Sequence, residues 1–132
     1  MIIGMETSSG GGGGSAPELV WVNNSPTSSF SAQTINESTT GWVSGKHVAD
    51  YDGFIILGQY DTSHNGQTFT YIPVSTPTFA PTLNYRYFAS ASSSDNGAQG
   101  RQVSFSSGIV IGSNNSTIPL YIWGIKGTLS NS

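Results

Sequence analysis

The two histidines, His47 and His64, are the residues best suited by type to acid–base or metal chemistry. His47 stands near Asp50 and Asp52, and His64 stands near Asp61. A catalytic pair or a metal site needs groups that converge on one point, and nothing in these spacings forces convergence. The two neighbouring aspartates would share a strand face and could help to hold calcium only with an acid from another loop. The acids are more typical of solvated turns, so no catalytic residue and no metal ligand is predicted.

Other catalytic signatures are also missing from the sequence. The chain has no cysteine, which excludes disulfides, thiolate catalysis, iron–sulfur clusters and cysteine-based zinc sites. It contains no phosphate-binding glycine motif, no Gly-x-Ser-x-Gly motif and no glycosidase carboxylate pair. The sequence therefore predicts a protein that is not an enzyme and needs no cofactor.

The charge and the lengths of the apolar stretches argue against two classes of partner. Only 8% of the 132 residues are charged, the net charge is −3, and the basic residues are Lys46, Arg86, Arg101 and Lys126. Four basic residues cannot neutralise a row of phosphates, so no nucleic acid partner is expected. No apolar stretch approaches the roughly 20 residues of a membrane span, so no membrane partner is expected either.

Large aromatic side chains are the best candidates for a contact surface. They are more numerous than one small domain readily buries, and few charges are present to break up the remainder. Flat amphipathic rings either line protein interfaces or stack on sugar rings at low entropic cost. Packing in the core is the alternative for each of them. The candidate interface or ligand-contact residues are Trp21, Trp42, Tyr60, Tyr85, Tyr87, Tyr121 and Trp123.

The first seventeen residues have the composition of a tether. Five consecutive glycines, Gly10 to Gly14, have no side chains to bury and the largest backbone entropy to lose, so a flexible segment is expected. An apolar group precedes them, and its members Met1, Ile2, Ile3 and Met5 are candidate attachment residues for a neighbouring subunit. A ragged terminus is the alternative. Residues 1–17 are thus predicted to be an attachment segment, and residues 18–132 a single domain.

The rest of the chain has the pattern of an all-β protein. Gly, Pro, Asn and Ser recur every eight to twelve residues, between short runs rich in β-branched and aromatic residues. Asn65-Gly66 and Asn96-Gly97 predict two hairpin turns. Strands are expected over Leu19–Val22, Phe30–Ile35, Phe54–Tyr60, Gln67–Ile72, Leu83–Ala91, Arg101–Phe105, Gly108–Gly112 and Thr117–Lys126, with weaker patterns at Gly41–Val43 and Lys46–Ala49.

The economical architecture is a two-sheet antiparallel β-sandwich, jelly-roll-like, because no segment shows a helical period. The continuous apolar run Gly53–Leu57 predicts a central strand covered on both faces. Prolines at 73, 77 and 81 predict an extended crossover between the sheets. The residues expected to meet between the sheets are Ile55, Leu57, Phe69, Val103, Phe105, Leu120 and Ile122.

Several of these strands resemble small β-sandwich modules of tailed bacteriophage virion proteins, of the tail, fibre or receptor-binding type. The segments that carry the resemblance are Gly53–Gly58, Tyr71–Val74, Tyr85–Ala89, Arg101–Phe105 and Ile118–Lys126. Such modules commonly work as trimers, so the resemblance implies a homo-oligomer in the virion with other virion proteins as partners. A capsid decoration protein is equally compatible. The chain contains no long fibre shaft, which implies a separate piece attached to other proteins.

The leading hypothesis is therefore a non-enzymatic virion structural protein that displays a β-sandwich for assembly or contact with the host surface, where a saccharide is a candidate ligand. The main alternative is a carbohydrate-binding module, in which rings on one face stack on sugars. A remote third reading is a metal-dependent hydrolase that uses the two histidines and the aspartates near them.

Overall fold

The computed structural model describes residues 16–27, 30–63, 66–75, 86–92, 97–113 and 117–127. The candidate attachment residues Met1, Ile2, Ile3 and Met5 lie outside these ranges. The division between an attachment segment and a domain at residue 17 therefore stays a prediction.

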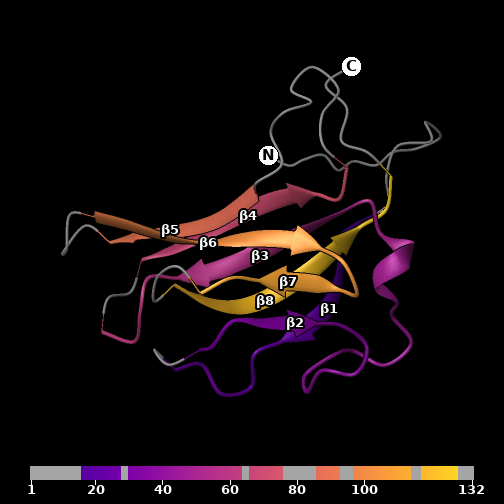
Figure 1. Ribbon diagram of the computed structural model, residues 1–132, viewed down its shortest axis with the longest axis horizontal. Coiled ribbons are helices and arrows are strands. Elements are labelled where there is room, and N and C mark those ends of the chain that lie inside the picture. The colour runs from indigo at the N-terminus through magenta and orange to yellow at the C-terminus, as the bar shows by residue number, and fades with distance from the viewer. Residues whose placement is uncertain are drawn as a thin grey trace.

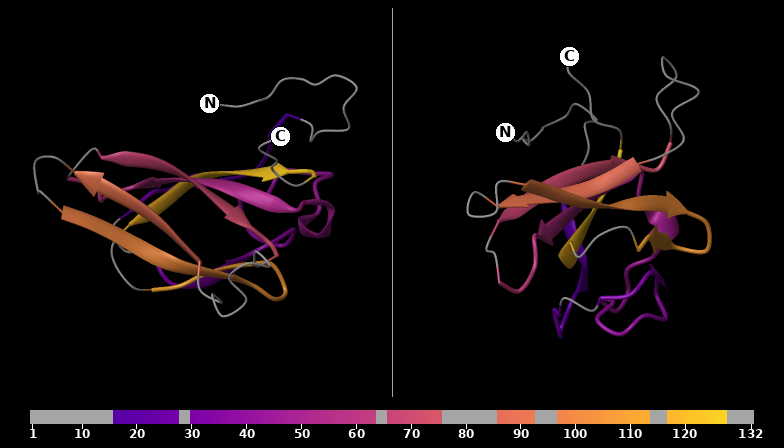
Figure 2. Two further views of the ribbon diagram at one scale, coloured as in Figure 1. Left: turned by 90° about the horizontal axis from the view of Figure 1, so that it is seen from above. Right: turned by 60° about the vertical axis from the view of Figure 1, so that its left-hand side comes forward.

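Within these ranges, eight strands form two antiparallel sheets of four strands each, which confirms the all-β sandwich (Figure 1). One sheet has the order β1-β8-β3-β4, and the other has the order β2-β7-β6-β5. The sheets lie as two layers, and the chain crosses between them four times (Figure 2, left). The strands are β1 (Glu18–Val22), β2 (Gln33–Ile35), β3 (Gly53–Gln59), β4 (Gln67–Pro73), β5 (Arg86–Ser92), β6 (Gly97–Phe105), β7 (Ile109–Ile111) and β8 (Ile118–Ile125).

Both predicted hairpins are present. β3 pairs with β4 from Gly53 opposite Pro73 to Gln59 opposite Gln67, and β5 pairs with β6. Asn65 and Asn96 lie outside the described residues, as does most of the predicted crossover, residues 76–85. Pro73 itself ends β4, which is an edge strand of its sheet, where a missing ladder donor is tolerated.

The two weaker strand patterns have different outcomes. Around Gly41–Val43 the chain makes one antiparallel bridge, between Trp42 and Trp21. The Val22 amide donates to the Gly41 carbonyl and the Val43 amide to the Val20 carbonyl, at 3.1 and 2.8 Å, so this short segment covers the free edge of β1. The expected strand at Lys46–Ala49 is wrong, because the chain turns there into a short 3-10 helix, Val48–Asp50.

The core lies between the two sheets. From the first sheet it takes alternate residues of β3, Phe54 and Ile56, and the Cβ that Gly58 lacks would point the same way, 3.0 Å from the ring of Phe88. Gly124 on β8 likewise leaves room for the buried ring of Tyr51. The cluster consists of Val20, Trp21, Ile35, Tyr51, Phe54, Ile56, Ile72, Phe88, Val103, Ile109, Ile111 and Ile122.

The predicted core set is therefore only partly correct. Val103 and Ile122 belong to the cluster, and Phe105 packs against it with its ring 5.9 Å from that of Phe54. Ile55, Leu57 and Phe69 point to the opposite side of their sheet, where Leu57 is nevertheless buried, and Leu120 is only half-buried beside a register shift in the β3–β8 pairing. Successive residues of a strand face opposite sides of the sheet. Choosing the wrong one of the two alternating sets of residues therefore exchanges the inner and the outer face.

A buried arginine stabilises the second sheet from inside. The Arg101 side chain donates from Nη1 to the Gly112 carbonyl at 2.7 Å, from Nη2 to the Phe30 carbonyl at 2.8 Å, and from Nε to the Thr117 carbonyl. The residue is 2% exposed, and burial lowers its pKa. Its guanidinium also lies 5.1 Å from the centre of the Phe30 ring. Arg101 thus joins three backbone segments. The carbonyls that it binds belong to residues outside the strands.

Candidate functional site

Aromatic side chains gather on the outer surface of the β1-β8-β3-β4 sheet. The register places Phe69 on β4 opposite Leu57 on β3, which in turn lies opposite Tyr121 on β8. The next outward row is Tyr71, Ile55 and Trp123, with Leu19 of β1 at its end. We call the surface formed by Phe69, Tyr71, Tyr121 and Trp123 the aromatic face.

Trp123 lies within contact distance of two other rings of this face. The centre of the Trp123 ring lies 5.8 Å from that of Phe69 and 5.7 Å from that of Tyr121, with interplanar angles of 46° and 36°. Phe69 is 66% exposed and Tyr121 is 40% exposed. The rings are tilted against one another, so they form a corrugated apolar surface rather than a flat platform.

The aromatic face is also uncharged. The three strands that carry it, β3, β4 and β8, contain no Asp, Glu, Lys or Arg at any position. Aromatic enrichment together with depletion of charge is the composition of the buried centre of a protein–protein interface. Solvent-exposed strands more often carry charged residues that prevent association, and that protection is missing here.

The predicted contact residues lie in different environments. Tyr121 and Trp123 lie in the aromatic face, while Tyr87 is 52% exposed on β5 in the other sheet. Trp21 and Tyr60 are 3% and 4% exposed, so they cannot offer a contact surface, because the core encloses them. Trp42 is half-buried, and its indole Nε1 donates to the Lys46 carbonyl at 2.8 Å. Tyr85 lies outside the described residues.

Two members of the aromatic face were not predicted as contact residues. The sequence predicts Phe69 to lie in the core, and it places Tyr71 only in an expected strand and in a segment of the family resemblance. On β4 the inward positions are Thr68, Thr70 and Ile72, of which only Ile72 is buried. The usual rule that the more apolar set faces inward therefore fails for this strand. The wide exposure of Phe69 depends on packing, and no local sequence signal indicates it.

A groove opens beside the aromatic face at the Tyr121 end. Its volume is about 340 Å³, and it is lined by Asn23, Pro26, Gln59, Thr62, Ile118, Leu120 and Tyr121. Two amide side chains of this lining bond within the protein. The Asn23 amide donates to the Pro119 carbonyl at 2.8 Å, and the Gln59 amide donates to the Asp61 carbonyl at 2.7 Å.

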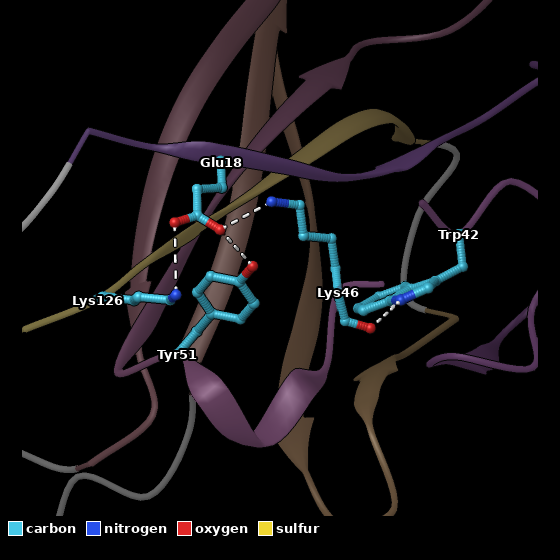
Figure 3. Close-up of polar contacts among 5 residues, drawn as sticks. All are labelled: Glu18, Trp42, Lys46, Tyr51 and Lys126. Atoms are coloured by element: carbon cyan, nitrogen blue, oxygen red, sulfur yellow. Dashed lines mark hydrogen bonds and ion pairs between the residues drawn. The ribbon is translucent and has the colours of Figure 1, made fainter. Parts of the chain in front are cut away.

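A second cluster joins the start of β1 to the end of β8 (Figure 3). The Glu18 carboxylate accepts a hydrogen bond from the Tyr51 hydroxyl at 2.8 Å and contacts Lys46 Nζ at 3.0 Å and Lys126 Nζ at 3.6 Å. The Tyr51 hydrogen bond, and next the Lys46 hydrogen bond, lower the pKa of Glu18. Burial and the same hydrogen bond to Glu18 raise the pKa of Tyr51.

The contacts of Glu18 give this cluster the geometry of a structural tie between β1 and β8, and the pKa shifts agree with that role. A carboxylate with a lowered pKa is a weak base, and a phenol with a raised pKa is a poor acid and nucleophile near neutral pH. The cluster instead holds the place where the described chain enters β1 beside the place where it leaves β8. Asp52 adds to this anchor, because its Oδ2 accepts from the Gly127 amide at 2.6 Å.

Of the two histidines in the predicted pattern, the structure describes only His47. His47 is exposed, and its Nδ1 lies 3.8 Å from Glu37, while Asp50 is exposed at the end of the 3-10 helix. His64 lies outside the described residues. Among the residues that are described, no three His, Cys, Asp or Glu side chains are grouped so that they could hold a metal ion.

No protein-family model, curated protein or solved structure matches the chain. Within the described ranges there is also no helix with the length and apolar character required to cross a bilayer.

Proposed function

We propose that this chain is a non-enzymatic structural protein of a bacteriophage virion, and that it assembles with other copies of itself and with other virion proteins through the aromatic face. The virion assignment rests on the resemblance of the strand segments to phage β-sandwich modules. Whether the protein sits on the tail, a fibre or the capsid is left open by that resemblance, and a host-surface saccharide is a further candidate contact.

The observation that carries the assembly role is the pair of exposed rings, Phe69 and Tyr121, on either side of the half-buried Trp123, on strands without a charged residue. Leaving such a surface in water is unfavourable by about 25 cal/mol for each Å² of apolar area. A protein partner that covers the face recovers this free energy, so the face favours association over a free monomer.

The carbohydrate-binding alternative draws on the same rings and therefore needs a direct comparison. Saccharide sites combine stacking rings with free amide or carboxylate groups that bind the hydroxyls. Beside the aromatic face, the side chains of Asn23 and Gln59 already bond within the protein. Protein assembly uses the rings alone, and so we favour it.

Light scattering coupled to size exclusion tests the proposal at several micromolar concentrations. We expect a mass of about three protomers of 13.8 kDa each, as the resemblance to trimeric modules implies. A strictly monomeric chain at every concentration would refute self-assembly. A glycan array tests the carbohydrate-binding alternative. Selective binding that is lost in Trp123→Ala would favour a carbohydrate-binding module.

A further inference from the structure

We propose that the occupant of the aromatic face is the apolar segment Met1–Met5 of a neighbouring copy of this chain, so that the copies assemble head to tail. This inference rests on the proposed function and names the partner of the same surface. The segment from one copy would cover the aromatic face of the next copy. A closed ring would form when the rotations between successive copies add up to a full turn.

The face and the segment have matching chemistry. The face offers tilted, uncharged rings with Phe69 at its most exposed point. The segment, Met-Ile-Ile-Gly-Met, has no charged side chain and supplies two thioethers and two branched aliphatic groups. A methionine sulfur makes favourable contacts with aromatic rings, and the flexible methionine side chain fits irregular gaps such as those between tilted rings.

The tether has the length that such an exchange needs. Ten residues, 6–15, separate Met5 from Ala16, where the described chain begins just before β1. Fully extended they reach about 34 Å. A domain of this size has a diameter of about 35 Å, so the tether can lead from β1 of one copy to the face of an adjacent copy.

Docking of the segment on the chain's own face is the competing arrangement. Leu19 lies opposite Trp123, so the face begins one strand away from the point where the tether joins. Phe69 on β4 lies three strands from β1, at roughly 15 Å, and a flexible ten-residue tether reaches that distance too, at about 5–6 Å times the square root of its length. Docking on the same copy would cover the face and leave the chain a monomer, so the proposed assembly requires the segment of a neighbouring copy.

Three variants of the full chain test the inference by light scattering. Phe69→Asp places a charge on the face, and the double variant Ile2→Asp, Ile3→Asp places charges on the segment. Each should dissociate the assembly to a monomer. Tyr87→Asp is the matched control, since Tyr87 is a similarly exposed aromatic residue on a strand of the other sheet, and it should leave the mass unchanged. Near-ultraviolet circular dichroism checks that all three variants keep the native fold.

Mixing the two damaged variants is the decisive step. The Ile2→Asp, Ile3→Asp chain keeps an intact face, and the Phe69→Asp chain keeps an intact segment. At high micromolar concentration the mixture should form a heterodimer with the mass of two protomers, although each variant alone is a monomer. A mixture that stays monomeric overturns the inference.

The remaining outcomes separate this inference from the proposed function. If the segment variant stays assembled while Phe69→Asp dissociates, the face is an interface but the segment is not its occupant, so only the inference fails. If Phe69→Asp stays assembled, or if the unaltered chain is itself a monomer, assembly through the aromatic face is wrong and both fail.

Discussion

The ring of Tyr71 lies directly over the backbone of Gly53 on the outer surface of the β1-β8-β3-β4 sheet. A Cβ built on Gly53 would come within 2.6 Å of the Tyr71 ring carbons, which is closer than real Cβ atoms approach other groups. The two residues belong to neighbouring strands of the β3–β4 hairpin. Gly53 therefore lets Tyr71 lie down on the sheet, and the absence of a side chain there helps to shape the aromatic face.

Gly53→Ala should destabilise the protein by about 1 to 3 kcal/mol, the usual cost of adding a methyl group where the packing has no room. Removing the ring should relieve most of that cost, so Gly53→Ala in a Tyr71→Ala background should be close to neutral. A double-mutant cycle from denaturant unfolding measures the coupling directly. Equal costs of Gly53→Ala in both backgrounds would show that the ring does not lie over Gly53.

Phe54→Ala and Phe69→Ala should differ strongly although both alter a phenylalanine of the same hairpin. Phe54 is fully buried, and its truncation should lower the free energy of unfolding by about 3 to 5 kcal/mol. Phe69 is mostly exposed, so its truncation in a dilute, monomeric sample should change that free energy by no more than about 0.5 kcal/mol. Urea titration at low protein concentration makes the comparison. A large loss of stability in Phe69→Ala would indicate instead that the odd-numbered residues of β4 face the core.

Arg101→Met should lower the free energy of unfolding by about 3 kcal/mol or more. The substitution keeps much of the side-chain volume but leaves three backbone carbonyls without the donors that they now have. Arg86→Met is the control, because Arg86 is only half-buried, and it should cost clearly less. Similar losses in both variants would mean that the three carbonyls find other partners, such as water.

Acid should weaken the tie between β1 and β8. The pKa of Glu18 is lower in the folded protein than its usual value of 4.5, so its carboxylate stabilises the fold above that pH. This contribution is lost as the pH falls below about 4.5 through the folded pKa, because the folded state then has to take up a proton against the Tyr51 and Lys46 hydrogen bonds.

Glu18→Gln should therefore be less stable than the unaltered protein at pH 7. Between pH 5 and pH 2 it should lose less stability than the unaltered protein loses. Thermal unfolding at each pH measures both effects. Glu37→Gln serves for comparison, since hydrogen bonds from its own backbone amide and that of Val48 lower the Glu37 pKa in a separate place. Parallel pH profiles for Glu18→Gln and the unaltered protein would count against the tie.

The sequence by itself determined that this is a β-sandwich and where most strands lie. Short β-branched and aromatic runs between Gly, Pro and Asn turns indicate strands regardless of their neighbours, and the β3–β4 and β5–β6 hairpins follow from local turn signals. It also established the uncharged character of β3, β4 and β8, because charge is a property of each residue alone.

Only the tertiary structure decided which side of each strand is covered. In β3 the apolar run is continuous, so alternation cannot distinguish Phe54 and Ile56 from Ile55 and Leu57. In β4 the bulkier residues Phe69 and Tyr71 face outward, against the rule. The aromatic face and the Glu18 cluster each unite residues from strands or loops distant in sequence. Their meeting depends on the pairing of β8 with β1 and β3, which is set by long-range packing and has no local signal.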